Sequence, residues 1–341
     1  MLVLGHVKNL LSCFAAGHVL AASAFGPKPT TIGLQVQRQL GQTLLRRRRN
    51  LAAMEAGYSG VHVNFSPMCD LIRDPRWGRV MESTGEDHFL NGLFSAAMVR
   101  GYQGNDLIEN VSLASCVKHF AAYGAAQAGR DYNSVDMSER TLREFYLPAY
   151  KKALDAGCKM VMTSFNIVDG IPATGNKWLL RDILRDEWGF EGVVISDWGA
   201  VSELVAHGYA KDKKEAARLA VLAGVDIDMM SSCYANYLPE LVYEGQISEK
   251  LIDEAVLRIL KLKRDLGLFE NPYHGADSKM EKKTILSKGI KEMAKSVSDR
   301  SIVLLKNENI LPLSKKTKAL GIIGPYVTAR HILGGWSCFG E

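Results

Sequence analysis

The sequence lacks the short motifs that bind the common cofactors. It has no Walker A loop, no GxGxxG and no HExxH, so neither an NTP, a dinucleotide nor a catalytic zinc is indicated. Its six cysteines are scattered without CxxC or Cys/His ligand spacing. Cys116 and Cys158 lie in or beside expected strands, which predicts buried thiols. We therefore expect no metal and no cofactor.

A strong charge of one sign is also missing. The net charge is +5 over 341 residues, and the basic runs at 46–49 and 282–291 contain no interleaved aromatic residues. Such runs are typical of solvated faces, so no nucleic-acid partner is expected. No apolar run is long enough to span a membrane. Residues 1–26 have the outline of a signal peptide, but His18 interrupts its apolar part.

What the sequence does contain, from about residue 57, is a regular alternation of strand-like and helical segments. Short apolar runs rich in β-branched residues are typical of buried parallel strands, and each of these is followed by a helical stretch. Such βα units predict an α/β fold, and their even spacing favours a TIM-type barrel. The expected strands are Val61–Phe65, Leu113–Val117, Met160–Phe165, Val193–Ser196 and Val225–Met229.

The pattern divides the chain into four parts. Residues 1–56 show no strand and form an atypical N-terminal segment, either a weak signal or a misassigned start. Residues 57–272 form the barrel, which has too few strands to close and is expected to be incomplete at its N-terminal strands. The polar segment 273–293 is expected to be a linker. Residues 294–341 begin a second α/β domain of sandwich type, with a helix near 294–304 and a buried strand at 319–325.

Asp197 is the first candidate for chemistry. It follows the buried run Val193–Ile195, and parallel α/β folds place their sites at the carboxyl ends of strands. Trp198 beside it offers a flat apolar face that can stack on a sugar ring. The alternative is that Asp197 caps a helix beginning near Val201.

Other polar residues follow the neighbouring strands. The loop 73–79 contains three arginines and two aspartates, which indicates either a salt-bridge scaffold or, at Arg79, a ligand contact. Lys118 and His119 would point to opposite faces of a regular strand, so both reach a ligand only if the backbone kinks there. The alternative is a surface lysine beside a structural histidine. Phe165 is expected in the core or the pocket wall.

Together these residues predict a pocket for a neutral, polyhydroxylated ligand. Glycoside hydrolysis needs two carboxyl groups, one as nucleophile or base and one as acid. Asp197 is a good candidate for the first, and the sequence shows no equally good second.

Six stretches together resemble glycoside hydrolase family 3, and most closely its periplasmic β-glucosidase branch. They occur in a specific order from about Gly60 to Glu341. The loop after KHF reads AAYG at 121–124, which differs from the hexosaminidase branch of the family. The six stretches are DPRWGR (74–79), GED (85–87), KHFAAYG (118–124), GRDYN (129–133), SDWGA (196–200) and SIVLLKNENILPL (301–313).

The resemblance implies a retaining double displacement on terminal β-D-glucosides. Asp197 would be the nucleophile that forms the glycosyl-enzyme. The sugar-binding residues would be Arg79, Lys118, His119, Trp198 and Phe165. Small β-glucosides or oligosaccharides would be the partners, and the periplasm or the exterior the location.

Two departures qualify this expectation. Residues 1–56 show no match to the family pattern, and the glutamate that serves the family as general acid/base is not found in this chain. We therefore expect a fragment with impaired hydrolysis. The alternatives are a non-catalytic fragment, a sugar-binding module, or a β-xylosidase.

Overall fold

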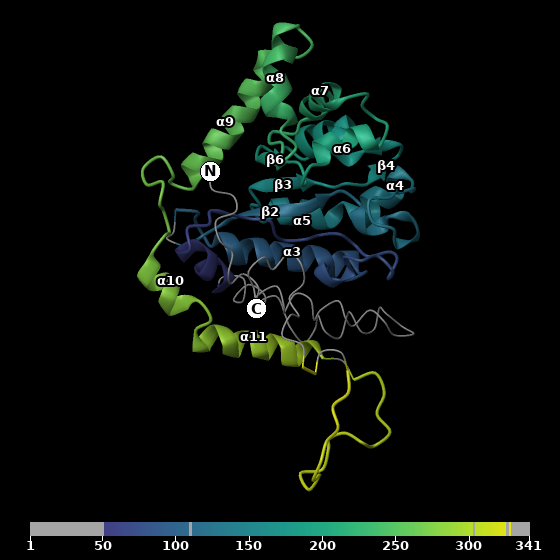
Figure 1. Cartoon of the computed structure of the whole chain (residues 1–341), viewed down its shortest axis with the longest axis vertical. Helices are drawn as coiled ribbons and strands as arrows, with labels where there is room; N and C mark the ends of the chain where they lie inside the picture. Colours follow the sequence, from purple (N-terminus) through teal and green to yellow (C-terminus); the bar gives the residue numbers. More distant parts are fainter. Residues whose placement is uncertain (1–50, 109–110, 303, 325–326, 329–341) are drawn as a thin grey trace.

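A parallel four-stranded sheet forms the centre of the structure, with strand order β1-β2-β3-β6 (Figure 1). The structure is a computed structural model that describes residues 51–108, 111–302, 304–324 and 327–328. The parallel pairing confirms the α/β class, and the described strands do not close into a barrel. The four strands are β1 (Val63–Asn64), β2 (Ala114–Phe120), β3 (Met160–Thr163) and β6 (Val193–Ile195).

Four of the five expected strands are thus present. All residues of β3 and β6 are buried, and Val161 pairs with Val194. The fifth, at Val225–Met229, is wrong as a strand, since it makes only an isolated bridge between Ile227 and Ile195. The carboxylate of Asp226, rather than a backbone carbonyl, accepts the N–H of Val194 at 2.8 Å, so the backbone ladder of a regular strand is interrupted there.

Helices connect the strands, and capping side chains set several of their starts. The side chains of Asp87, Ser138 and Asp212 each accept a backbone N–H in the first turn. These bonds satisfy N–H groups that have no partner inside the helix. The connecting helices are α3 (His88–Gln103), α4 (Glu139–Thr141), the π-helix η5 (Leu142–Tyr146), α5 (Pro148–Asp155), the π-helix η7 (Trp178–Glu187), α6 (Ala200–Ala206) and α7 (Lys213–Ala223).

Four helices follow along the chain. The expected linker 273–293 contains α10 and the start of α11, and the helix expected at 294–304 begins earlier than predicted. They are α8 (Cys233–Tyr243), α9 (Glu249–Asp265), α10 (Ser278–Thr284) and α11 (Lys288–Ser301). Shorter elements are the hairpin strands β4 (Ile167–Val168) and β5 (Ile171–Pro172) and the 3-10 turns η2 (Val80–Glu82), η3 (Tyr123–Ala125), η4 (Gln127–Gly129) and η6 (Ala173–Gly175).

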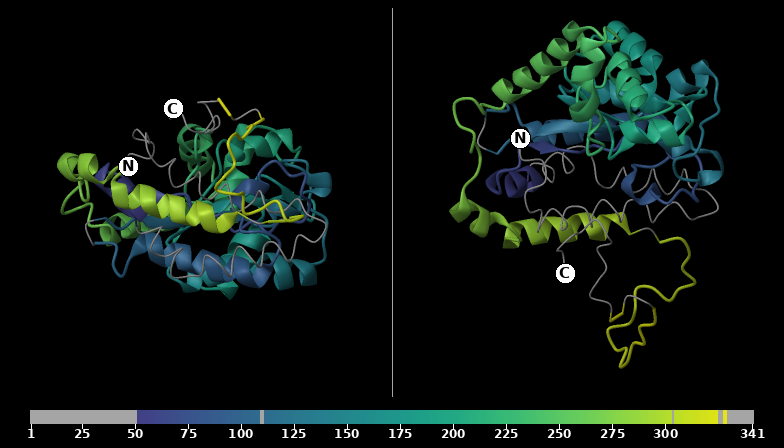
Figure 2. Two further views of the ribbon diagram at one scale, coloured as in Figure 1. Left: turned by 90° about the horizontal axis from the view of Figure 1, so that it is seen from below. Right: turned by 45° about the horizontal axis from the view of Figure 1, so that its top comes forward.

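The segment after α11 differs from its prediction. The buried strand expected at 319–325 is wrong for the residues described, because 318–324 form no strand and Ile323 is 99% exposed. An apolar run becomes a strand only where another strand can pair with it, and no described strand lies beside this one. Figures 1 and 2 show the yellow segment extending away from the sheet beyond α11.

The core lies on both faces of the sheet. On one face Val117, Val161 and Val194 pack in a cluster with residues of α5, η7, α6 and α7. On the other, Met160 and Ile195 pack against the end of α9 in a second cluster. The thiols of Cys116 and Cys158 are buried and free, as expected. No described helix is long and apolar enough to cross a membrane.

Candidate active site

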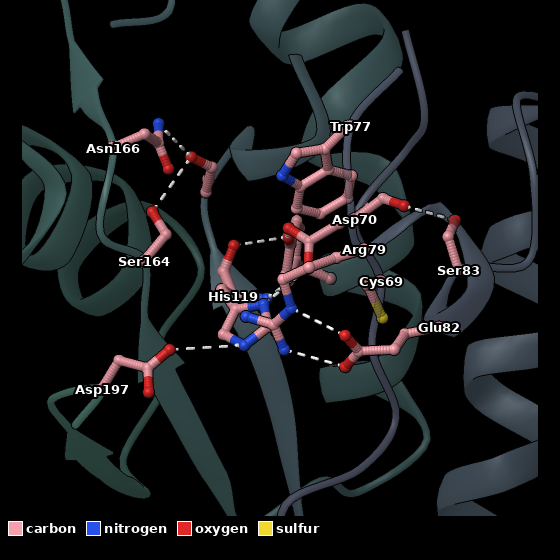
Figure 3. A network of polar contacts seen from close by, with 12 residues as sticks. Cys69, Asp70, Trp77, Arg79, Glu82, Ser83, His119, Ser164, Asn166 and Asp197 are labelled. Carbon is pink, nitrogen blue, oxygen red and sulfur yellow. Dashed lines mark hydrogen bonds and ion pairs between the residues drawn. The ribbon is translucent and has the colours of Figure 1, made fainter. Parts of the chain in front are cut away.

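Polar side chains gather where β1, β2 and β6 end, and three loops supply most of them (Figure 3). Asp70 follows β1, His119 lies near the end of β2, and Asp197 comes two residues after β6. Since parallel strands place their carboxyl ends at one edge of the sheet, residues distant in sequence meet there. The sequence therefore identified the correct edge for Asp197 and His119.

His119 lies between two carboxylates. Its Nδ1 is 2.7 Å from Oδ2 of Asp70, and its Nε2 is 3.4 Å from Oδ2 of Asp197. The side chains of His119 and Asp70 are almost fully buried, at 1% and 0% exposure. Tyr150 contacts Asp70 on the side away from Asp197. Its hydroxyl lies 3.0 Å from Oδ1 of Asp70 and 2.6 Å from the carbonyl oxygen of His119.

Asp197 is held by its own turn. Its Oδ1 accepts the backbone N–H of Trp198 at 2.7 Å, and its Oδ2 has no hydrogen-bond partner among the described residues. The alternative role as a helix cap is wrong, because α6 begins after Gly199, with φ of 71°, and has no side-chain cap. The Asp197 side chain is thus 12% exposed and turned toward His119 rather than toward the helix.

Arg76 and Arg79 both form salt bridges, as one of the two roles left open for this loop predicts, and the ligand contact of Arg79 stays a prediction. Arg76 pairs with Asp74 at 2.6 Å on the surface, as a salt-bridge scaffold would. Arg79 donates to both oxygens of Glu82 at 2.7 and 2.8 Å, and its guanidinium lies 5.6 Å from the centre of the Tyr123 ring. Figure 3 shows the contacts of Arg79 with Glu82, and the charge of Arg79 contributes to lowering the pKa of His119.

The kink needed to bring Lys118 and His119 to one site is present. The pairing of β2 with β3 shifts register between Val117 and Phe120, so the regular alternation of side chains is broken between them. The charge of Lys118 contributes to lowering the pKa values of His119 and Glu82. Lys118 therefore lies near enough to His119 and Glu82 for its charge to act on both.

Aromatic rings line the approach to this cluster. Phe165 is buried and stacks on Tyr132 with ring centres 4.3 Å apart. Trp198 is 43% exposed and Tyr132 42%. Rings that are half-exposed beside a polar site offer the flat apolar faces on which a sugar ring can stack.

Burial and neighbouring charges shift the pKa values of the site in different directions. Burial raises the pKa of Asp70 to about 7, although Arg79 and the hydroxyl of Tyr150 oppose this. Burial lowers the pKa of His119 well below its usual value, with Lys118 and Arg79 acting in the same direction. Burial also raises the pKa of Glu203, and the charge of Asp197 adds to that rise. No group of three potential ligands among the described residues is arranged to hold a metal.

With this geometry established, comparison with known proteins identifies the family. The family model described as the glycosyl hydrolase family 3 N terminal domain matches residues 15–262. The chain belongs to glycoside hydrolase family 3. The match also extends into residues 1–56, where motifs alone had shown no likeness, so that expectation is wrong from residue 15 onward.

Relatives of this family 3 chain include glucosidases and xylosidases. It is 41% identical to the periplasmic beta-glucosidase of Salmonella typhimurium, over 92% of this chain and 41% of the relative. It is 38% identical to a putative beta-xylosidase of Formosa agariphila, over 83% of this chain and 38% of the relative. The chain therefore spans about two fifths of the length of these relatives.

A solved beta-glucosidase from Listeria innocua shares the fold. It superposes with a TM-score of 0.86 at 54% identity, covering 90% of this chain and 43% of the other. This likeness confirms the TIM-barrel-like class expected for the family 3 chain. Further structures of that enzyme hold glucose and, in a mutant, laminaribiose.

Sequence reasoning did not select several residues that the structure brings to this site. Asp70 stands in the polar stretch after the first strand, but nothing in that stretch distinguished it from its neighbours. Tyr132 belongs to the GRDYN motif, but the motif alone does not place its ring at the site. The stacking of that ring on Phe165 does. Tyr150 and Glu203 lie within helical segments, where a polar residue usually faces solvent.

Proposed function

We propose that this chain carries the nucleophile of a retaining β-glycosidase, with Asp197 as the nucleophile. The observation that carries the proposal is the position of its carboxylate: it follows β6, it lies 3.4 Å from His119, and its Oδ2 has no hydrogen-bond partner among the described residues. A carboxylate can act as the nucleophile of a retaining glycosidase by bonding to the anomeric carbon of the sugar.

In the first step a carboxylate oxygen of Asp197 bonds to the anomeric carbon of the sugar. The bond between that carbon and the leaving oxygen breaks, and its electron pair departs with the leaving group. The leaving group takes a proton from solvent. A water molecule then attacks the anomeric carbon, the bond from that carbon to the Asp197 oxygen breaks, Asp197 regains its carboxylate, and the water's proton passes to solvent. We assign no general acid/base, whose help is typically worth about 10²–10⁴ in rate. We therefore expect weak hydrolysis of substrates with poor leaving groups.

The groups around Asp197 support sugar binding. Arg79, Lys118 and His119 would hold hydroxyl groups, and their hydrogen bonds would strengthen as the ring flattens toward an oxocarbenium-like state. Trp198 and Phe165 would supply the apolar walls.

We infer that the substrate is a terminal β-D-glucoside or a small oligosaccharide ending in one. The 54% identity to an enzyme solved with glucose supports this choice over a xyloside. A β-xyloside is the second candidate, because relatives at 38% identity include xylosidases. The periplasmic beta-glucosidase among the relatives supports a periplasmic location.

A mechanism-based label tests the proposal. The chain is incubated with a 2-fluoro-β-glucoside carrying an activated leaving group, and then weighed by intact-protein mass spectrometry. We expect one glycosyl adduct that maps to Asp197 and is absent in Asp197→Asn. The matched 2-fluoro-β-xyloside should label more slowly.

Other outcomes decide between the alternatives. Faster labelling by the xyloside would assign the chain to the second substrate. Saturable binding of glucose without any adduct would identify a sugar-binding module. No adduct and no binding, in a chain that melts cooperatively, would show a non-catalytic product.

A further inference from the structure

Helix α9 has one face that packs on the molecule and one that is largely exposed. On the packed face Ala255 and Leu262 are buried, and the guanidinium of Arg258 pairs with Asp226 at 2.9 Å. Since side chains three and four residues apart share a face of a helix, these contacts fix which side of α9 points outward. Figure 1 and the right view of Figure 2 show α9 along the margin of the molecule.

The centre of this outer face is apolar. Val256, Leu257 and Leu260 are 45%, 64% and 39% exposed. A single exposed apolar side chain is common on a protein surface, but these three lie within little more than one turn and form a continuous ridge. Such a ridge is typical of a surface that contacts another molecule.

The apolar surface continues from the ridge toward α8. Leu238 and Val242 of α8 and Ile252 of α9 line a groove of about 360 Å³ between the two helices. Ile252 lies four residues before Val256, so the groove adjoins the ridge along α9. Groove and ridge together offer more apolar area than the ridge alone, and a specific contact between proteins needs such an area.

Charged side chains of opposite sign flank the ridge. Asp253 lies four residues before Leu257, and Arg264 lies four residues after Leu260. Among the described residues Asp253 forms no ion pair, and Arg264 approaches only the adjacent Asp265, at 3.4 Å. The outer face therefore has a negative end, an apolar centre and a positive end.

A face with this order of charges is complementary to a copy of itself turned end to end. A two-fold axis between positions 258 and 259 places Leu257 of one copy against Leu260 of the other. The same axis places Asp253 of one copy against Arg264 of the other, and each of these pairs forms twice because the contact is isologous.

Other occupants fit this face less well. Two parallel α9 helices would place Asp253 beside Asp253 and Arg264 beside Arg264, where like charges repel. A lipid surface carries one sign of charge, so it would attract one end of the ridge and repel the other. The order of the charges thus favours an antiparallel copy of the same helix.

We propose that the outer face of α9 is a docking surface for a second copy of this chain, with the two α9 helices antiparallel. The proposal does not depend on the proposed function, because no residue of this face belongs to the candidate active site. Helix α9 spans 17 residues, about 25 Å, so the contact is small. We expect a weak dimer with a Kd on the order of 10 µM.

Sedimentation velocity on the full chain tests the proposal, at concentrations from about 1 to 200 µM, on both sides of the expected Kd. The wild type should change from monomer to dimer over this range. Leu257→Lys places a charge in the centre of the contact and should stay monomeric throughout. Phe89→Lys is the matched control, since Phe89 is 56% exposed on α3, and it should dimerise as the wild type does.

An exchange of charges tests the antiparallel arrangement. Asp253→Arg places two arginines opposite each other and should weaken the dimer by about 10-fold. Adding Arg264→Asp to the same chain restores opposite charges in both pairs, so the double variant should recover the wild-type Kd. Recovery of this kind is specific to residues that face each other across the contact.

Each contrary result overturns a stated part of the proposal. A wild type that stays monomeric over the whole range overturns the docking surface, and so does a dimer that Leu257→Lys leaves unchanged. A double variant no tighter than Asp253→Arg alone overturns the antiparallel arrangement. If Leu257→Lys does not fold, the two charge variants decide, because they leave the apolar ridge intact.

Discussion

Among single side chains, Arg79 of the site forms an ion pair with Glu82, which lies three residues later in the turn η2. The two side chains are 23% and 26% exposed, so the pair is more sheltered than the surface pairs of this protein. Burial would raise the pKa of Glu82, but the hydrogen bonds and charge of Arg79 outweigh it and lower that pKa to about 2. The pair therefore stabilises the fold at pH values at which Glu82 is ionised.

Replacing Glu82 by Gln should lower the free energy of unfolding at pH 7 by about 2 kcal/mol, between the values for exposed and buried pairs. The folded pKa of Glu82 is below the unfolded one, so this contribution is fully present above pH 4.5 and is lost as pH falls toward 2. Urea unfolding of both chains at several pH values measures the difference.

The control is Glu139→Gln. Glu139 also contacts an arginine at 2.7 Å, but that pair is exposed and Arg143 keeps Glu187 as a partner. We expect a loss of at most about 0.5 kcal/mol there. Equal effects of the two substitutions, or an effect of Glu82→Gln that does not shrink at low pH, would contradict this account.

Among the elements, the loop after β2 depends on close approach between two backbone segments. A Cβ placed on Gly124 would lie 2.3 Å from the carbonyl oxygen of Leu71 and 3.4 Å from the ring of Trp77. The N–H of Arg73 also bonds to the carbonyl oxygen of Gly124 at 3.0 Å. The loop that carries Asp70 and the segment that follows β2 are thus held together at a position where only glycine fits.

We expect Gly124→Ala to lower the free energy of unfolding by about 3 kcal/mol, because the backbone must move to admit the methyl group. Gly78→Ala is the matched control in the neighbouring loop, since nothing lies within 4 Å of a Cβ there. It should change stability by less than about 0.5 kcal/mol. Thermal melts of both variants measure these changes. An unchanged stability of Gly124→Ala would contradict the prediction and show that the backbone moves to admit the methyl group with little loss of free energy.

In the molecule as a whole, the sheet with its helices differs sharply from the segment that follows α11. All residues of 304–324 are exposed, and this stretch contains neither helix nor strand. Its apolar side chains, including Ile310, Leu320 and Ile322, are largely exposed, at 70%, 65% and 70%. Proteases cleave such exposed backbone first.

Among the described residues, we therefore expect trypsin to cut first after the lysines of this segment. The products, followed by mass spectrometry over time, should end at Lys306, Lys315, Lys316 or Lys318, while the chain up to α11 resists. A first cut after Lys213 or Lys214 in α7 would contradict the expectation and show that helix to open more readily.

Elements whose signals lie within a few residues were predictable. Helix α7 begins after Asp212, whose side chain accepts the N–H of Glu215 at 2.8 Å, and ends before Gly224, with φ of 105°. Helix α8 has no side-chain cap and contains Pro239, so no such signal marks it in the sequence. The site followed the same rule: Asp197 and His119 were chosen from their strand ends, whereas the Asp70–His119 contact joins residues 49 apart and left no local sign.

The sequence by itself determined the α/β class, most strand positions, the helix caps and the edge of the sheet where polar residues meet. These depend on side-chain period and on hydrogen bonds between near neighbours, which the order of residues specifies directly. Only the tertiary structure decided that Ile227 forms a bridge rather than a strand, that residues 318–324 stay exposed, and that Asp70 supports His119. Each of these depends on which distant segment comes to lie alongside, because a strand, an apolar side chain or a buried carboxyl group is stable only with the partner that the fold brings to it.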